Sequence, residues 1–434
     1  MTSKASEASS HPSNSTDLAT NGSAELGDCT VSSQATVATV KPEQSTPERT
    51  TFRPGFLPSL EGLRAVASMG IIGTHVAFQT GHDVGALWER VLGRFDFFVA
   101  VFFALSGFLL WRSHRSGYGG IPRRKALAES DRGRKKSWAK YYKKRFARIM
   151  PAYWVLVLIV LIALPVGSGA DFKTWLTNLT LTQVYFAGTL HGGLTHLWSL
   201  SVEVAFYIAL PLFAIGLSRL DPHRMQGRRI AAICLLAALS FGWPYLPLPY
   251  PEGVNPHIQP IAYFSWFAVG MVLAELESLQ GVDSDAARTK VATMQRWARR
   301  RPLWLAIAVA ALVLAAYLGP EGLVEMSNWE YTRRLWCGLV FGAAIIGPWA
   351  LAPESRFLEH PVMQALGRWS YGIFLWHVAM LSVAFPLLGV KLFTGHILSV
   401  TIVTVALSIP VAAASYALVE EPARRFFGRV WVNR

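Results

Sequence analysis

Three ionisable side chains interrupt long apolar runs in this sequence: His75, Glu203 and His377. An ionisable group at membrane depth costs about 3 kcal/mol on insertion scales, so such residues usually face a cavity and serve a function. A carboxylate beside a histidine orients the imidazole and strengthens it as a general base. We therefore expect His75 and Glu203 to form a catalytic pair, and His377 either to join the site or to hold two helices together.

The expected depths of these three side chains agree. His75 lies eleven residues after Arg64, which marks the inner end of its run, while Glu203 and His377 lie seven and nine residues into theirs. At 1.5 Å per residue these spacings are roughly 16, 10 and 13 Å. All three side chains should therefore lie between the middle and the outer part of a membrane.

Three arginines stand at the start of apolar runs. Arg64 opens the first run, and Arg145 and Arg148 open the third. Any one of them can be an anchor whose charged group reaches the membrane interface. Together, at the inner mouth of a polar path, they would suit a phosphorylated ligand, because guanidinium groups bind phosphate in a bidentate manner. Both interpretations stay open.

The elements that carry these residues are apolar runs close to the roughly 20 residues that span a bilayer as a helix. Ten such runs lie at approximately 62–80, 93–112, 149–167, 196–217, 229–247, 260–276, 302–319, 334–352, 366–388 and 396–418. Of the 434 residues, 52% are hydrophobic and only 16% are charged, whereas about a quarter are charged in a typical soluble domain. The sequence therefore predicts an all-α integral membrane protein, a bundle of about ten transmembrane helices.

Positive charge alternates along the loops between these runs. Lysine and arginine concentrate in the second, fourth, sixth and eighth loops and after the last run, and they are scarce in the others. Because short basic loops remain in the cytoplasm, we expect both termini to be cytoplasmic and the protein to be a multi-pass protein of the cell (inner or plasma) membrane. A net charge of +14 that is confined to loops argues against a nucleic-acid partner.

Three segments follow from this pattern. Residues 1–52 are rich in Ser, Thr, Ala and Glu and are expected to form a disordered cytoplasmic tail; a basic region followed by an apolar core, as in a signal peptide, is missing. Residues 53–425 hold the transmembrane domain and residues 426–434 a basic cytoplasmic tail. The cysteines (Cys29, Cys234 and Cys337) are far apart, so neither a metal site nor a disulfide framework is expected.

Five stretches, in order, resemble the motifs of the membrane-bound acyltransferase-3 family. They are 60–75 (Leu-Glu-Gly-Leu-Arg-Ala through a histidine), 96–108 (phenylalanines, then Ser-Gly-Phe), 144–153 (Lys-Arg-Phe-Ala-Arg-Ile-Met-Pro-Ala-Tyr), 196–207 (His-Leu-Trp-Ser-Leu-Ser-Val-Glu through Phe-Tyr) and 366–377 (Ser-Tyr-Gly-Ile-Phe-Leu-Trp-His at its end). One match would be weak, but five in order over about residues 57–425 are specific.

The resemblance implies transfer of an acyl group, usually acetyl, from cytoplasmic acyl-CoA to a hydroxyl of an envelope carbohydrate or glycolipid on the far side. His75 would be the general base on that hydroxyl, or would briefly carry the acyl group itself; the sequence does not separate the two. Glu203 would orient the imidazole.

The resemblance also implies a binding path and no bound cofactor, since acetyl-CoA is the donor substrate. The basic inner mouth, formed by Arg64, Arg145 and Arg148, would receive the phosphates of the coenzyme. The further residues expected along the path are His377, Ser106 and Tyr371. Ser106 also suits a close contact between helices, and Tyr371 also suits packing or the membrane interface.

The sequence departs from the family pattern in two places. Many members have a second acidic or amide residue after the motif glutamate, whereas this chain has Val204 and Ala205, which leaves Glu203 alone. Some relatives carry a fused extracytoplasmic hydrolase-like domain. This sequence stops at Arg434, so we expect direct transfer to an acceptor or a separate envelope transport or biosynthesis partner.

The acceptor is the least defined part of the prediction. High Ala and Gly usage and a Ser/Thr-rich tail indicate a GC-rich bacterium, for instance an actinobacterium. Related enzymes in such organisms modify envelope glycolipids such as trehalose mycolates, which are one candidate acceptor.

Two other classes of protein remain open. A secondary transporter would use Arg64, His75, Glu203 and His377 as a relay, a common role of intramembrane ionisable groups, but the inverted repeats typical of transporters are not evident. A scaffold or biogenesis factor would use the same residues only to hold helices together, which five ordered motifs disfavour.

Overall fold

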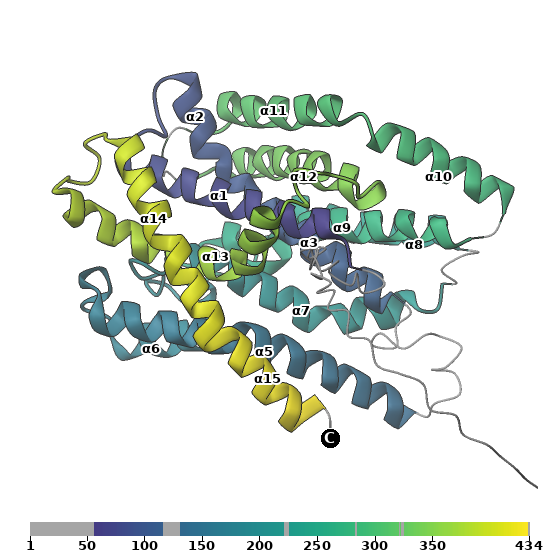
Figure 1. Cartoon of the computed structure of the whole chain (residues 1–434), viewed down its shortest axis with the longest axis horizontal. Helices are drawn as coiled ribbons and strands as arrows, with labels where there is room; N and C mark the ends of the chain where they lie inside the picture. Colours follow the sequence, from purple (N-terminus) through teal and green to yellow (C-terminus); the bar gives the residue numbers. More distant parts are fainter. Residues whose placement is uncertain are drawn as a thin grey trace, which may run out of the picture. The chain divides into compact units, whose positions relative to one another are not determined.

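The computed structural model describes residues 56–115, 131–220, 225–282, 284–320, 322 and 325–432, and this part of the chain is helical, without a strand (Figure 1). The tail predicted at 1–52 lies outside it. The ten longer helices that match the predicted runs are α1 (Pro58–Thr80), α3 (Phe98–His114), α5 (Asp131–Ala163), α7 (Trp198–Leu217), α8 (Gln226–Gly242), α9 (Phe264–Glu277), α11 (Arg301–Leu318), α12 (Asn328–Leu351), α13 (Pro361–Leu388) and α14 (Ile397–Ser415).

Each predicted apolar run coincides with one of these helices, so the all-α integral membrane class is confirmed. Within the described residues, eight helical segments are long and apolar enough to cross a membrane. The two remaining predicted spans are α1, which carries Glu61, Arg64 and His75, and α8, which has 17 residues.

Several helices extend beyond the prediction. The basic segment before the third run is itself helical: α5 starts at Asp131, so Arg145 and Arg148 lie in mid-helix rather than at a helix start. Short helices also lie in the predicted loops, namely α2 (Leu87–Gly93), α6 (Phe172–Leu179) and α10 (Asp285–Ala298). Lysine and arginine favour helices as strongly as leucine does, but a search for apolar runs does not register them.

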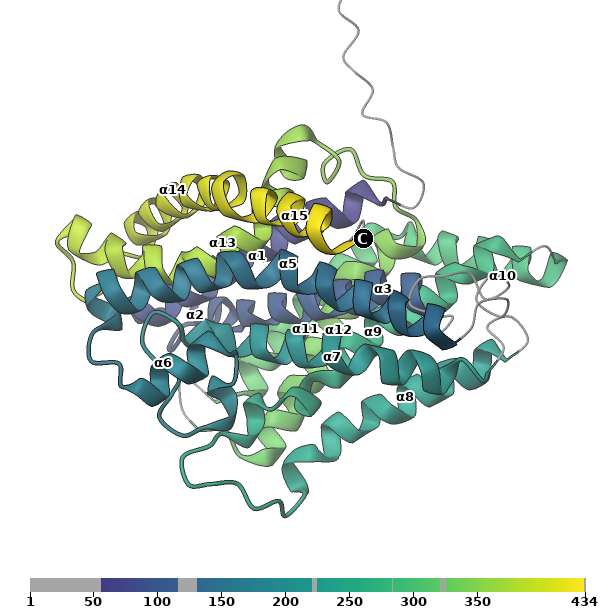
Figure 2. The same ribbon diagram turned by 90° about the horizontal axis from the view of Figure 1, so that it is seen from below.

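The last span is also longer than predicted. A π-helical turn (Tyr416–Glu420) connects α14 to α15 (Glu421–Phe427), and a second such turn (Gly428–Val432) follows. Residues 426–432, assigned to the C-terminal tail, are therefore helical. α15 packs against α5 (Figures 1 and 2), and Phe427 and Trp431 contact Phe146 there.

The helix ends follow local sequence signals. Proline at the first turn starts α1 and α13, where its missing N–H costs nothing. Gly81 and Gly389 end these two helices in the left-handed conformation, which glycine adopts without steric cost. α1 and α13 pack against each other, and both carry residues of the site.

α3 and α9 cross at very close range because glycines lie where their backbones meet. A Cβ on Gly107 would overlap the carbonyl oxygen of Phe267, and a Cβ on Gly270 would overlap that of Ala104. Small residues allow such close approach between helices in membranes. The crossing fixes α3, which carries Ser106.

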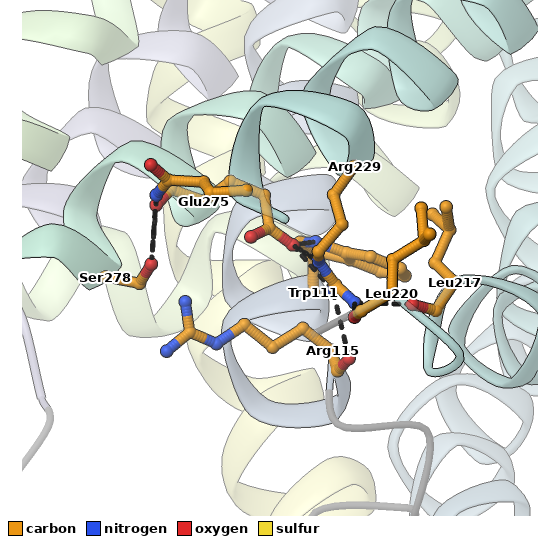
Figure 3. A network of polar contacts seen from close by, with 8 residues as sticks. Trp111, Arg115, Leu217, Leu220, Arg229, Glu275 and Ser278 are labelled. Atoms are coloured by element: carbon orange, nitrogen blue, oxygen red, sulfur yellow. Dashed lines mark hydrogen bonds and ion pairs between the residues drawn. The ribbon is translucent and has the colours of Figure 1, made fainter. Parts of the chain in front are cut away.

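A buried ion pair joins α3, α7, α8 and α9 (Figure 3). The Arg229 and Glu275 side chains are fully buried, and Arg229 Nη2 lies 2.7 Å from Glu275 Oε1. The indole nitrogen of Trp111 donates to the same oxygen at 2.7 Å. Arg229 also donates to the backbone carbonyls of Leu217, Leu220 and Arg115. All five of its N–H groups therefore have acceptors.

Breaking this pair is expected to destabilise the bundle. Arg229→Met leaves the Glu275 carboxylate buried without its counter-charge, which costs about 3–5 kcal/mol. We expect a clearly lower thermal unfolding midpoint in detergent. Arg228→Met is the matched control, because Arg228 is the neighbouring residue on α8 and is exposed. Equal midpoints for the two variants would contradict this role.

Candidate active site

A cavity of about 330 Å³ lies between α1, α3, α5, α7 and α13. We call it the basic cavity, because three of its lining residues are the predicted arginines. Its lining includes six of the eight predicted site residues: Arg64, Arg145, Arg148, Ser106, Glu203 and Tyr371. Residues nearly 310 positions apart in the sequence thus share one cavity.

The arginines line the cavity from two helices. Arg64 comes from α1, and Arg145 and Arg148 come from α5. All three side chains are half-buried. Arg145 lies over the Tyr207 ring with its guanidinium carbon 5.9 Å from the ring centre, and its Nε is buried without a hydrogen-bond partner in the described part of the chain. Guanidinium groups that line a cavity in this way can bind an anionic group.

Two further basic residues line the cavity and were not predicted. Arg112 and His114 come from the last turn of α3. Arg112 forms an ion pair with Glu277 at 3.1 Å, while the His114 ring stacks on Trp138 of α5. Both residues lie where the second apolar run meets the basic loop that follows it. The only sequence signal for them is the high density of basic residues in that region.

Among the described residues, Glu203 is the only carboxylate that lines the basic cavity. It accepts hydrogen bonds from the Ser106 and Tyr207 hydroxyls, and these two hydroxyl oxygens lie 3.1 Å apart. Tyr207 was not predicted as a site residue, although it is four residues after Glu203 and therefore shares its helix face. Glu203 thus anchors a cluster of hydroxyls on the cavity wall.

Tyr371 joins the wall of the cavity from α13. Its hydroxyl donates to the carbonyl oxygen of Ile149 on α5 at 2.8 Å. Ile149 follows Arg148 directly, so this hydrogen bond fixes the register of α13 against the arginine-bearing turn. Its geometry matches the packing role that the sequence also allowed.

His75 and His377 lie outside the lining of the basic cavity and beside each other. Their ring centres are 5.0 Å apart. A third ring, His196, lies 4.8 Å from His377 and 6.1 Å from His75. His196 belongs to the 3₁₀ turn η4 (Thr195–Leu197) that leads into α7. We call these three residues the histidine cluster.

The predicted pair of His75 and Glu203 is not formed. The Glu203 carboxylate is hydrogen-bonded to Ser106 and Tyr207, and no contact between His75 and a carboxylate is found among the described residues. Agreement in depth placed both side chains at one level, but depth does not determine the position around a helix bundle. The imidazole partners of His75 are histidines.

Two residues connect the basic cavity to the histidine cluster. Phe374 lines the cavity and packs against His196 and His377, at ring-centre distances of 5.5 and 6.0 Å. Ser199 also lines the cavity, and its hydroxyl donates to the His196 carbonyl at 3.0 Å. The cluster therefore lies directly behind one wall of the cavity.

In the described residues no group of three or more His, Cys, Asp or Glu side chains is arranged to hold a metal ion. The cluster rings are edge-on or tilted to one another.

Comparison with known proteins identifies the family. Residues 57–413 match the acyltransferase-3 family, described as "Acyltransferase domain". The chain belongs to this family and is an integral membrane acyltransferase. The match spans all helices from α1 to most of α14 and includes every residue of the basic cavity and of the histidine cluster.

Relatives cover the same region at low identity. The chain is 26% identical over 408 residues to acyltransferase MdmB of Streptomyces mycarofaciens, covering 86% of this chain and 93% of that protein. It is 22% identical over 394 residues to peptidoglycan O-acetyltransferase OatA of Listeria monocytogenes, and 23% identical over 397 residues to O-acetyltransferase OatA of Staphylococcus aureus. These alignments cover 85% and 86% of this chain but only 56% and 58% of the two OatA proteins. No solved structure matches the chain.

Proposed function

We propose that this protein transfers an acyl group, acetyl in the simplest case, from cytoplasmic acyl-CoA to a hydroxyl of an extracytoplasmic carbohydrate or glycolipid. The observation that carries the proposal is the basic cavity, whose lining combines three arginines with Phe374 and Ser199, and these last two residues contact the histidine cluster. Such a cavity suits a ligand that carries both phosphates and a reactive thioester.

The arginines would bind the phosphates of the donor. Bidentate guanidinium–phosphate contacts are strong and directional, and the unpartnered Arg145 Nε is a donor available to a ligand. Glu203 would balance the positive charge of the arginines and fix the Ser106 and Tyr207 hydroxyls. The acyl-pantetheine arm would then extend along the cavity toward Phe374.

His75 would perform the transfer. As a general base it takes the proton of the acceptor hydroxyl while the hydroxyl oxygen bonds to the thioester carbonyl carbon. The carbon–sulfur bond then breaks, and the departing thiolate takes the proton from His75. As a nucleophile, a ring nitrogen of His75 would bond to the acyl carbon while the carbon–sulfur bond breaks, and the departing thiolate would take the proton from the other ring nitrogen. In a second step the acceptor oxygen would bond to the acyl carbon, the nitrogen–carbon bond would break, and the hydroxyl proton would return to the imidazole. Both routes need the imidazole beside the reacting carbonyl.

The topology that this reaction needs follows from the loop charges. Basic loops in the cytoplasm put both termini there and place Arg145 and Arg148 near the inner face of the cell membrane. The donor would then enter from the cytoplasm, and His75, further along α1, would meet an acceptor from the outer side.

The acceptor is proposed as an envelope carbohydrate or glycolipid, with a trehalose mycolate as one candidate. Two of the relatives are named O-acetyltransferases, one of them acting on peptidoglycan, and another comes from an actinobacterium. Mass spectrometry of envelope lipids and glycans from a deletion strain should reveal one species that loses 42 mass units per missing acetyl group. An unchanged envelope would contradict this assignment.

Arginine-to-glutamine variants test where the donor binds. Arg145→Gln removes a charge-assisted contact to phosphate, so we expect the KM for acetyl-CoA to rise about 10- to 100-fold. Acetyl-pantetheine, which lacks the nucleotide, should show the same KM with both proteins. Lys143→Gln is the matched control, since Lys143 lies on the same helix and is exposed. An equal KM for acetyl-CoA in the Arg145 variant and the wild type would contradict the binding mode.

A further inference from the structure

The histidine cluster contains two rings whose tautomers are fixed by the backbone. His377 Nδ1 lies 2.7 Å from the carbonyl oxygen of Phe374, and His196 Nε2 lies 3.1 Å from that of Leu375. A carbonyl oxygen only accepts hydrogen bonds, so each of these nitrogens carries the proton and donates. The two donors thus hold opposite positions on their rings.

The other nitrogen of each ring is buried and has no partner. His377 Nε2 and His196 Nδ1 make no hydrogen bond within the described part of the chain, and His377 and His196 are 0% and 2% exposed. A proton on either nitrogen would create a buried charge without a carboxylate beside it, which is costly. Each ring is therefore neutral, and each of these nitrogens carries a lone pair.

His75 is the ring that can use these lone pairs. It is half-buried, its ring centre lies 5.0 Å from that of His377, and no hydrogen bond fixes it in the described residues. Two imidazoles at this separation reach hydrogen-bonding distance when a nitrogen of each faces the other. Phe78 packs against His75, and Phe374 packs against His196 and His377.

We propose that His377, supported by His196, is the positioning residue of the catalytic imidazole, in the place that the sequence assigned to Glu203. In the proposed arrangement the His75 ring turns so that one of its nitrogens donates a hydrogen bond to the Nε2 lone pair of His377, a contact that the two rings do not make in the structure, where their centres lie 5.0 Å apart. The opposite nitrogen of His75 then carries the lone pair that removes the hydroxyl proton. When His75 is protonated in the reaction, both of its ring nitrogens carry a proton. The fixed dipoles of the neutral His377 and His196 rings then stabilise the positive charge of His75.

This inference rests on the proposed function but can fail separately from it. The test compares asparagine and glutamine substitutions of His377 and of His196. Asparagine places its amide group close to the position of the histidine Nδ1, and glutamine places it close to that of Nε2. Each variant therefore replaces one ring nitrogen and omits the other.

The expected order of activity is opposite at the two positions. His377→Gln supplies an acceptor near the Nε2 position and should keep a kcat roughly 10- to 100-fold above that of His377→Asn. His196→Asn supplies an acceptor near the Nδ1 position and should exceed His196→Gln in the same way. If the two rings serve only to donate hydrogen bonds to the Phe374 and Leu375 carbonyls, both orders reverse. His377→Asn would then exceed His377→Gln, because asparagine replaces the donor Nδ1, and His196→Gln would exceed His196→Asn, because glutamine replaces the donor Nε2.

The assay is incorporation of labelled acetyl-CoA into envelope material of membrane vesicles that contain the full chain, normalised to the amount of protein. His75→Ala is measured in parallel. Wild-type incorporation with His75→Ala would overturn the proposed function. Loss of incorporation with His75→Ala, together with reversed or equal amide orders, would overturn this inference alone.

Discussion

His75→Ala is expected to lower the rate of acyl transfer about 10²- to 10⁴-fold, the contribution typical of a general base. The KM for acetyl-CoA should stay near that of the wild type, because His75 lies outside the lining of the basic cavity and its removal leaves the arginines there unchanged. Turnover of labelled acetyl-CoA in membrane vesicles, with kcat and KM determined separately, measures both.

His82→Ala is the matched control for this variant. His82 follows directly after the glycine that ends α1, and its ring hydrogen-bonds only to Thr80 in the described part of the chain, so its removal should leave kcat unchanged. A His75→Ala variant that keeps more than half of the wild-type kcat would exclude both routes that we propose for this imidazole.

Glu203→Ala should produce the second largest loss, about 100-fold in kcat/KM. The change deletes the shared acceptor of the Ser106 and Tyr207 hydroxyls, and a hydrogen bond to a charged group is worth about 1.5–3 kcal/mol. It also removes the one carboxylate found among the described lining residues, so the positive charge of the arginines in the basic cavity is no longer balanced. Glu203→Gln keeps the shape and one acceptor oxygen, so it should lose less.

The division of the Glu203 effect between kcat and KM distinguishes two roles. A carboxylate that shapes the donor cavity changes the KM for acetyl-CoA, and Tyr207→Phe should reproduce a smaller part of that change because it removes one of the two donors. A carboxylate that orients His75 changes kcat alone. An unchanged KM in Glu203→Gln would therefore contradict the geometry and favour the pairing that the sequence predicts.

The apolar runs predicted the membrane helices because hydropathy and length decide whether a helix can span a bilayer. The same criterion did not detect the first half of α5 or α10, whose charged residues form helices without apolar runs. Six of the predicted site residues line one cavity, since the motifs that carry them come from helices that pack together.

The partner of His75 could not be predicted in the same way. Spacing from the helix ends gave the depth of each side chain but not its direction around the bundle, so Glu203 and His75 were placed together at the same level. The sequence placed His196 at the start of the motif at 196–207 and did not assign it to the catalytic site. Its role depends on the 3₁₀ turn before α7 and on the Leu375 carbonyl of α13, and neither is visible in the local sequence.

The most direct measurement uses sealed inside-out vesicles with labelled acetyl-CoA added only to the outer, originally cytoplasmic, side. We predict that label accumulates on carbohydrate or glycolipid inside the vesicles, protected from an esterase added outside, and that His75→Ala and Arg145→Gln reduce it. Label that appears only on the outer side, or that enters equally in the His75→Ala vesicles, would contradict transfer through this cavity.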